Sequence, residues 1–384
     1  MQFDFTKKPP IFFGPGTVGL AGEKAKGFGW NKVILIYDKG VKAVGIVDKV
    51  TASLDAAGVS YVEFDKVLPD PADVIIEEAA EVARNEKVDG VIAVGGGSPL
   101  DVGKCVSILL TNPSPLSNYF GMNFDLNPVP GSILITTNAG TGSEVSDTAI
   151  VTDTVNNVKL GIVGEFSKAK LALVDPELTY GLPASLTAVG ALDAFAHGFE
   201  SFTGTGNNPF TEMYAQKSMK LIVQNLPIAV QNPGNVIART NLSLAATMAG
   251  MAFGDAMVHL GHNVGQNVSA LAHLPHGTSC MLGLLAIIEF ITDAVPEKIR
   301  WVGSLFGLDP CAQLTNEELG KEVASRFKTF CDNVGAPTSL SAAGVDEAIL
   351  EDAANLIAAD PVLQLFTPKK LSADKALELL KNVF

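Results

Sequence analysis

Four residues have the types and spacing to hold a divalent metal ion: Asp193, His197, His262 and His276. Asp193 and His197 are four residues apart, so on a helix their side chains lie on one face. His262 and His276 follow later in the chain, fourteen residues apart. One carboxylate with three neutral imidazoles suits Fe(II) or Zn(II) and does not distinguish between them. The set therefore predicts a metal site able to act as a Lewis acid.

Two further histidines leave an alternative open. His259 and His273 are also fourteen residues apart, so spacing alone does not decide which pair would bind the metal. The structural alternative for each of these histidines is a ring that only makes hydrogen bonds within the fold.

A glycine-rich segment is the second candidate for binding chemistry. Gly95-Gly-Gly-Ser-Pro-Leu-Asp101 follows an apolar run at residues 91–94 and precedes a helix-like stretch. Glycines let a backbone approach a diphosphate closely, and the free amides at a helix start attract negative charge. The segment predicts a dinucleotide site, although it lacks the Gly-x-Gly-x-x-Gly spacing, and a turn without a ligand is the alternative.

Asp38 and the segment 135–144 extend this candidate cofactor site. Asp38 ends the apolar run 33–37, where a carboxylate can bind a ribose 2′-hydroxyl and repel a 2′-phosphate. It therefore favours NAD over NADP, with a solvent-facing turn residue as the alternative. Residues 135–144 place hydroxyls and glycines after another strand, and we expect them to line the nicotinamide side.

The predicted secondary structure that must position these residues differs between the two halves of the chain. In the first half, apolar runs at residues 32–37, 60–64, 90–94 and 131–136 are separated by helix-like stretches at 44–57 and 72–85. This alternation predicts a parallel sheet covered by helices. From residue 182 onward the chain reads as long helices, including 184–202, 209–231 and 235–253. The prolines and glycine at 175–183 place the boundary there, giving domains 1–180 and 181–384.

Composition limits the class of partner. The chain has 384 residues, 47% hydrophobic content and a formal charge of −14. An acidic surface repels nucleic acids and anionic membranes, so we expect a small-molecule partner. The apolar runs are too short to span a bilayer, and no signal peptide precedes the fold, so we expect no membrane association and a cytoplasmic location. The four cysteines, Cys105, Cys280, Cys311 and Cys331, show no Cys-x-x-Cys spacing, and we expect ordinary buried thiols.

Ordered motifs along nearly the whole chain add a resemblance to a known family. They are residues 13–16 (Phe-Gly-Pro-Gly), 95–104, 139–144 (Ala-Gly-Thr-Gly-Ser-Glu), 175–178, 182–183, 190–197, 249–253 and 275–277 (Pro-His-Gly). Together they resemble the iron-containing, or group III, alcohol dehydrogenases, which have a dehydroquinate-synthase-like fold. The resemblance implies an α/β Rossmann-like NAD-binding domain followed by an all-α metal-binding domain.

The same resemblance implies specific ligands. It assigns the metal to Asp193, His197, His262 and His276, since Pro-His-Gly anchors His276 and His262 stands nine residues after Phe253. It favours Fe(II), with Zn(II) as the alternative metal. His273 is then expected to be structural. The cofactor-binding residues that we expect are Asp38, Gly96, Gly97, Ser98, Asp101, Thr136, Thr137, Asn138, Thr141, Ser143, Lys159, Leu178 and Leu182.

One departure from the family pattern concerns proton transfer. The second histidine of the family's His-x-x-x-His element is Gln266 here, and glutamine does not titrate near neutral pH. His259 lies one helical turn before His262, and we expect it to point into the same pocket and replace the lost imidazole. We therefore count His259 and Gln266 with the four ligands as candidate catalytic residues.

The resulting hypothesis is an NAD(H)-dependent metal oxidoreductase. A metal beside the nicotinamide would polarise the oxygen of a small primary alcohol, a diol or a hydroxy acid, or of the matching aldehyde or ketone. The alternative is a dehydroquinate-synthase-like lyase, which needs a basic cluster for phosphate and carboxylate. Residues 184–280 contain only Lys217, Lys220 and Arg239 as lysine or arginine, which disfavours the lyase. Relatives often form dimers or larger assemblies, so we expect a homo-oligomer.

Overall fold

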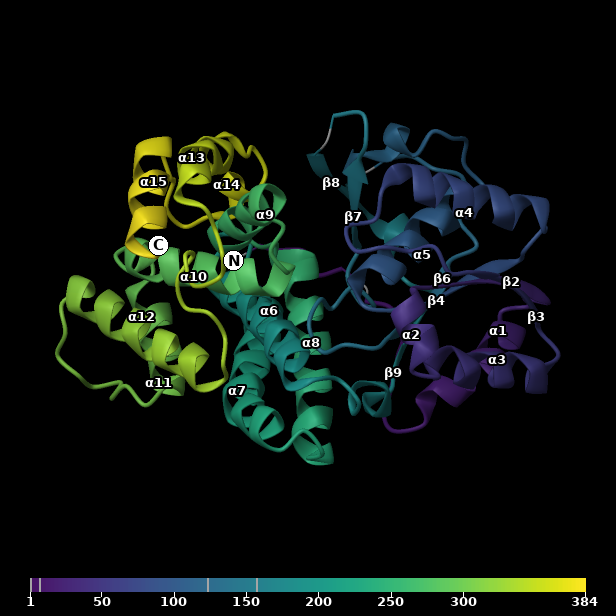
Figure 1. Cartoon of the computed structure of the whole chain (residues 1–384), viewed down its shortest axis with the longest axis horizontal. Helices are drawn as coiled ribbons and strands as arrows, with labels where there is room; N and C mark the ends of the chain where they lie inside the picture. Colours follow the sequence, from purple (N-terminus) through teal and green to yellow (C-terminus); the bar gives the residue numbers. More distant parts are fainter. Residues whose placement is uncertain (1, 7, 123, 157) are drawn as a thin grey trace. The chain divides into compact units, whose positions relative to one another are not determined.

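The computed structural model describes residues 2–6, 8–122, 124–156 and 158–384. The chain forms two compact units, one of Lys7–Gly181 and the other of Leu182–Phe384 together with Met1–Thr6 (Figure 1). The first residues were predicted to belong to the N-terminal domain. In the structure, Phe3 and Phe5 lie against Phe210 of the helical unit.

A parallel sheet forms the centre of the N-terminal unit. Within the described ranges it has six strands in the order β1-β9-β6-β4-β2-β3, and every neighbouring pair is parallel. The strands are β1 (Ile11–Phe13), β2 (Lys32–Tyr37), β3 (Ser60–Phe64), β4 (Gly90–Gly95), β6 (Ser132–Thr136) and β9 (Leu171–Val174). This order brings the carboxyl ends of β2, β4 and β6 together at one edge, where ligands of open α/β sheets bind.

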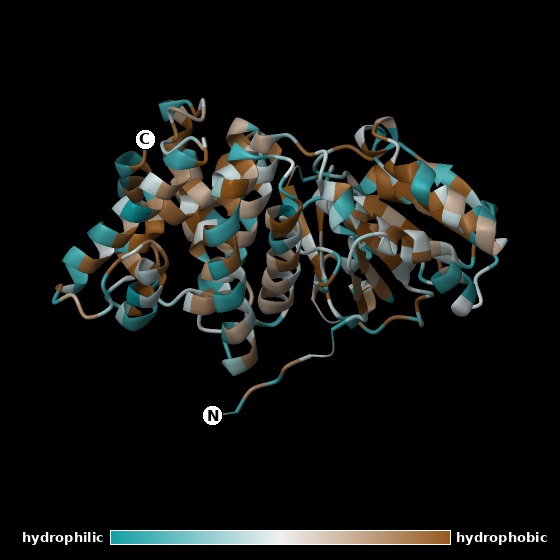
Figure 2. Cartoon of the chain, turned by 90° about the horizontal axis from the view of Figure 1, so that it is seen from below, coloured by the Kyte–Doolittle hydropathy of each residue, from teal (hydrophilic) through white to brown (hydrophobic). Residues whose placement is uncertain are grey.

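Helices cover both faces of this sheet because the residues that point to each face are apolar. On β2, Ile34 and Ile36 pack with α4 (Asp73–Asn85) and α5 (Gly97–Leu109). Val33 and Leu35 pack on the opposite face with α1 (Ala21–Gly27) and α3 (Ile46–Ala57). Figure 2 shows the resulting helices with hydrophobic and hydrophilic sides. The predicted parallel α/β arrangement is confirmed.

A second, smaller sheet was not predicted. It contains β5 (Gly121–Met122), β7 (Thr148–Asp153) and β8 (Val158–Val163), with β7 and β8 antiparallel. The sequence between residues 137 and 175 alternates weakly in hydrophobicity, so it carried no clear strand signal.

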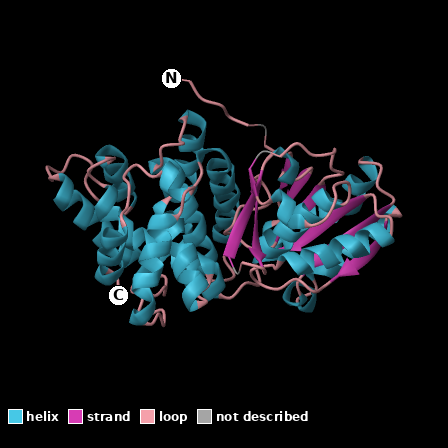
Figure 3. Ribbon diagram, turned by 90° about the horizontal axis from the view of Figure 1, so that it is seen from above, coloured by secondary structure: helices cyan, strands magenta, loops and turns pink. Residues whose placement is uncertain are grey.

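The second unit is built from helices (Figure 3). The helices that carry the candidate metal ligands are α6 (Ala184–Thr203), α9 (Leu260–Ala272) and α10 (His276–Ile291). Of these, α6 packs with α7 (Pro209–Gln231) and α8 (Val236–Ala256), and α10 packs with both α6 and α9. The outer helices are α11 (Pro296–Leu305), α12 (Asn316–Asn333), α13 (Leu350–Ala359), α14 (Leu363–Phe366) and α15 (Ala373–Asn382). None of the described helices has the length and apolarity needed to cross a bilayer.

Candidate functional site

Asp193 and His197 lie one turn apart on the buried side of α6. Their residues are 3% and 6% exposed, and Nδ1 of His197 is 4.0 Å from Oδ2 of Asp193. The His197 ring stacks on Phe253 of α8, with ring centroids 4.4 Å apart. Burial lowers the pKa of His197 well below its ordinary value, so its ring is neutral.

His262 is held in place by a buried carboxylate, Glu200, also on α6. Oε1 of Glu200 accepts hydrogen bonds from the amides of His259, at 2.8 Å, and His262, at 3.0 Å, and so caps the start of α9. Oε2 bonds Nδ1 of the His262 ring. Burial opposes ionisation of Glu200, but the charge of His262 and its hydrogen bond outweigh burial and lower the pKa of Glu200 to about 2. The ring is thereby fixed with Nε2 toward Asp193, 4.0 Å from Oδ1.

His276 begins α10 directly after Pro275. Its Nε2 is 3.7 Å from Oδ1 of Asp193, and its side chain is 43% exposed. The close approach of α10 to α6 depends on Gly277. A Cβ there would lie 2.3 Å from the Val189 carbonyl oxygen and 2.9 Å from Cβ of Asp193. Only glycine lets the two helices bring these ligands together.

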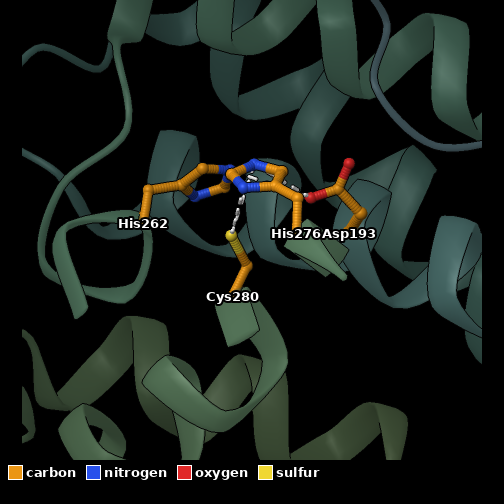
Figure 4. A group of neighbouring side chains, drawn as sticks. All are labelled: Asp193, His262, His276 and Cys280. Atoms are coloured by element: carbon orange, nitrogen blue, oxygen red, sulfur yellow. Dashed lines mark hydrogen bonds and ion pairs between the residues drawn. The ribbon is translucent and has the colours of Figure 1, made fainter. Parts of the chain in front are cut away.

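Cys280 follows His276 by one turn of α10. Its Sγ is 3.5 Å from Nε2 of His276. Asp193, His262, His276 and Cys280 each offer one ligand atom, and these atoms all lie within 4.8 Å of one another. Figure 4 shows the four side chains pointing toward one another. Burial raises the pKa of the Cys280 thiol, but the neighbouring His262 and His276 outweigh it and lower the pKa.

The chemistry of this cluster fits a bound cation. Oδ1 of Asp193 and Nε2 of His262 are buried and have no hydrogen-bond partner. A buried polar atom left without a partner is costly, and a metal ion would satisfy both atoms at once. The donors available are a carboxylate, imidazoles and a thiol, all of which bind Fe(II) or Zn(II).

The glycine-rich segment forms a second site, within the N-terminal unit. Gly96 precedes α5, whose N-terminus has no side-chain cap, so its first amides are free to bind a phosphate. A Cβ at Gly96 would lie 3.1 Å from Nδ2 of Asn138, and one at Gly97 would lie 3.0 Å from Thr141. A cavity of about 780 Å³ opens here, lined by residues that include Asp38, Gly96, Gly97, Ser98 and Asn138. Its size and its free amides fit part of a dinucleotide.

Comparisons with known proteins bear on the whole chain. Residues 9–176 match the family described as iron-containing alcohol dehydrogenase, and residues 187–384 match the C-terminal domain of the Fe-containing alcohol dehydrogenase family. The chain is 33% identical to a 1,3-propanediol dehydrogenase of Citrobacter freundii, over 100% of this chain and 99% of the relative.

The chain belongs to the iron-containing alcohol dehydrogenase family. A crystal structure of a 1,3-propanediol oxidoreductase has a TM-score of 0.95 and 31% identity, covering 100% of both chains. A sulfoacetaldehyde reductase from Bifidobacterium kashiwanohense, solved in complex with NAD+, has a TM-score of 0.89 and 26% identity over 100% of this chain and 99% of that one. The predicted family, fold class and reaction class, NAD-dependent interconversion of alcohols and aldehydes with a metal, are confirmed.

In this alcohol dehydrogenase, five of the predicted cofactor residues line the cavity named above, and the others lie elsewhere. Thr136 and Thr137 are buried at the end of β6, where the Thr137 amide donates to the Gly95 carbonyl. Lys159 pairs with Asp70 at 2.7 Å. Leu178 is part of the sheet's apolar core. Leu182 belongs to the helical unit, where its carbonyl accepts a hydrogen bond from Arg239.

Asp101 and Ser143, two of the predicted cofactor residues, bond to each other. Asp101 accepts hydrogen bonds from Oγ of Ser143, at 2.6 Å, and from the Ile150 amide. The buried Lys104 ammonium donates to Ser143 at 2.8 Å and lies 3.4 Å from Asp101. This network fixes the loop after β6 against α5.

The two residues expected to carry protons differ in their surroundings. The His259 ring is fully buried, 2.9 Å from Oγ1 of Thr203, and burial lowers its pKa to about 4. It is not in the group of converging ligand atoms. Gln266 is on α9, one turn after His262, and donates from Nε2 to Asp360 at 2.9 Å. His273 ends α9 in the left-handed region, exposed and away from the cluster.

Two residues at this site were not predicted from the sequence. Glu200 and Cys280 were not selected, although each carries a usable signal. Glu200 stands seven residues after Asp193, and Cys280 four after His276, so both share a helix face with a ligand. The expectation that all cysteines are ordinary buried thiols is wrong. Cys280 lies among the ligands, and Cys311 is exposed.

Proposed function

We propose that this chain interconverts small polar primary alcohols and their aldehydes, using NAD(H) and a metal held by Asp193, His262 and His276. A fourth donor comes from His197 or Cys280. The observation that carries the proposal is the pair of buried atoms without partners, Oδ1 of Asp193 and Nε2 of His262, aimed at a common point with His276.

The cofactors supply Lewis-acid polarisation of the substrate oxygen and a hydride acceptor or donor. The residues of the chain position the metal ligands and the cofactor. Glu200 fixes the His262 ring, and the first amides of α5 bind the diphosphate. Asp38 selects NAD, because its carboxylate lines the cavity and would repel a 2′-phosphate.

Proton exchange in this proposal does not use His259. Its ring is fully buried and neutral at physiological pH, so it has no route to solvent. Gln266 does not titrate. The proton therefore passes to water on the side of the cluster where His276 is exposed.

The lyase alternative finds no support in the helical unit. Arg239 is buried and donates hydrogen bonds to Oγ1 of Thr187 and to the Leu182 and Pro233 carbonyls. Its guanidinium therefore bonds within the fold and does not face a phosphate or carboxylate ligand. Lys217 and Lys220 are exposed on α7. The named relatives instead act on a diol and on sulfoacetaldehyde, which supports a small polar substrate here.

We also propose a cytoplasmic homo-oligomer. The four cysteines are free, which suits a reducing compartment. Phe3, Phe210 and Met213 are 41%, 47% and 54% exposed where the N-terminal segment lies on α7, and they offer an apolar surface for a second copy. Light scattering on the purified protein tests the oligomeric state.

An NADH oxidation screen tests the proposed reaction. Metal-free protein is loaded separately with Fe(II) or Zn(II) and assayed with short aldehydes that are unsubstituted, hydroxylated or anionic. We expect metal-dependent turnover, fastest with a polar substituent, and weak activity with NADPH. Absence of turnover with every aldehyde and both metals contradicts the proposal.

A further inference from the structure

Gln266 lies on α9 between the levels of two metal ligands. It follows His262 by four residues, so the two side chains share a face of the helix. A short connection at 273–275 makes α9 and α10 antiparallel, and the contact of Gly265 with Cys280 sets their register. His276 precedes Cys280 by one turn, so it is level with the turn of α9 that follows Gly265. Gln266 therefore stands between His262 and His276 along the helix.

Solvent reaches α9 first at Gln266. Residues 259–265 are buried, and Gln266 is the first partly exposed residue of the helix. The side chain of His276 is 43% exposed, whereas those of Asp193 and His262 are only 4% and 7% exposed. A substrate that comes from solvent therefore meets the cluster on the side where Gln266 and His276 lie.

Asp360, which follows α13, fixes the orientation of the Gln266 amide. Its Oδ2 accepts a hydrogen bond from Nε2 of Gln266 at 2.9 Å. Its Oδ1 accepts the amides of Val362, at 2.9 Å, and Leu363, at 2.7 Å. An ionised carboxylate only accepts hydrogen bonds, so the Gln266 amide must turn its NH₂ group toward Asp360. Its oxygen, Oε1, then faces away from Asp360, and no hydrogen bond from the described part of the chain reaches it.

The helices around the cluster carry no basic side chain. Helices α13 and α14 pack on α9 (Figure 1), and neither they nor the ligand-bearing α6, α9 and α10 contain a lysine or arginine. A carboxylate or sulfonate group of a substrate is bound well by such a side chain. In this unit it would instead meet the negative charge of Asp360. A neutral hydroxyl group can donate a hydrogen bond to Oε1 of Gln266.

We propose that Gln266 and Asp360 select a neutral, hydroxyl-bearing aldehyde, or the matching diol, over an anionic substrate. The inference rests on the proposed function and names the substrate class of that site. Oε1 of Gln266 accepts a hydrogen bond from the remote hydroxyl of the substrate. Asp360 holds the amide in that orientation and repels an anion. The selection thus combines an attraction for one class with a repulsion of the other.

Three aldehydes with three carbons each test the selection: 3-hydroxypropanal, propanal and the anion 3-oxopropanoate. With metal-loaded wild-type enzyme and NADH, kcat/KM should be highest for 3-hydroxypropanal and about tenfold or more lower for the anion. Gln266→Met keeps the length of the side chain and removes the amide. It should lose about tenfold in kcat/KM with 3-hydroxypropanal and little with propanal. Turnover of propanal shows that the variant is folded and holds its metal.

Asp360→Asn tests the charge separately. Asparagine still accepts the Val362 and Leu363 amides, so the start of α14 is retained. The ratio of kcat/KM for 3-hydroxypropanal to that for 3-oxopropanoate should fall about tenfold, because the repulsion is lost. Asp352→Asn, an exposed carboxylate of α13, and Gln313→Met, an exposed glutamine, are the controls and should leave the ratios unchanged.

The outcomes separate the inference from the proposed function. A wild-type enzyme that reduces 3-oxopropanoate as well as 3-hydroxypropanal overturns the inference. So does an unchanged ratio in Gln266→Met or in Asp360→Asn. These results would leave the proposed function standing. Absence of turnover with all three aldehydes refutes the proposed function, and the inference with it.

Discussion

Glu200 holds His262 by both its main chain and its ring. One carboxylate oxygen accepts the His262 amide at 3.0 Å, and the other bonds Nδ1 of the same residue. A ring nitrogen bonded in this way directs the opposite nitrogen, Nε2, toward the metal position. Glu200 therefore acts through His262 as a positioning residue.

Replacing Glu200 with glutamine should weaken metal binding by about 10- to 100-fold. An amide NH₂ facing Nδ1 would favour the ring form with its proton on Nε2, which cannot bind a metal. Chelator competition measures the affinity, and Glu347→Gln, an exposed carboxylate, is the control. Equal affinities for Glu200→Gln and the wild type would show that the carboxylate does not position the ring.

Asp38→Asn should relax the preference for NAD. The Asp38 side chain also caps α2 (Lys39–Ala43) by accepting the Val41 amide, and asparagine keeps that bond while removing the charge. We expect kcat/KM with NADPH to rise about tenfold, the equivalent of 1.4 kcal/mol. Asp55→Asn, an exposed carboxylate of α3, is the control. No gain with NADPH would mean that another group excludes the 2′-phosphate.

Gln266→His should introduce a titrating group one helical turn from His262. The dependence of kcat on pH should gain an ionisation near the ordinary histidine pKa of about 6.5 that the wild-type enzyme lacks. Gln231→His, at the exposed end of α7, controls for histidine elsewhere. A profile identical to that of the wild type would place Gln266 away from the reacting groups.

Gly277→Ala should separate α10 from α6. The added Cβ would overlap the Val189 carbonyl oxygen, so the variant should lose about 1 to 3 kcal/mol of unfolding free energy and bind metal more weakly. Gly27→Ala, where a Cβ would meet nothing within 4 Å, should be nearly neutral. Urea unfolding and chelator competition provide the two readouts. Unchanged metal affinity in a destabilised Gly277→Ala would contradict the role of this contact in ligand placement.

Elements with strong periodicity were predictable from sequence. The runs 32–37 and 60–64 coincide with β2 and β3, and the stretch 209–231 coincides with α7, even though Pro227 lies inside it. The local sequence of each segment indicates its secondary structure, either by a run or alternation of apolar residues or by a helical period. The β7–β8 hairpin was missed because its hydrophobic alternation is weak.

Side-chain partners far apart in sequence were not predictable. Asp101 accepts hydrogen bonds from Ser143 and from the Ile150 amide, which are 42 and 49 residues away in sequence, and neither bond was predicted. His259 looked like a pocket residue from its spacing to His262, and only the packing of α6 on α9 reveals its contact with Thr203. Tertiary packing decides which face of a helix meets which neighbour.

His276→Ala gives the most direct test of a metal-dependent NAD(H) oxidoreductase. The change removes a ligand in the helical unit, while the cavity of Asp38, Gly96 and Asn138 lies within the N-terminal unit. Bound metal, NADH affinity by fluorescence and aldehyde-dependent NADH oxidation are measured on the same preparation. We predict loss of metal and turnover with NADH affinity retained; full turnover by a metal-free His276→Ala would contradict the account.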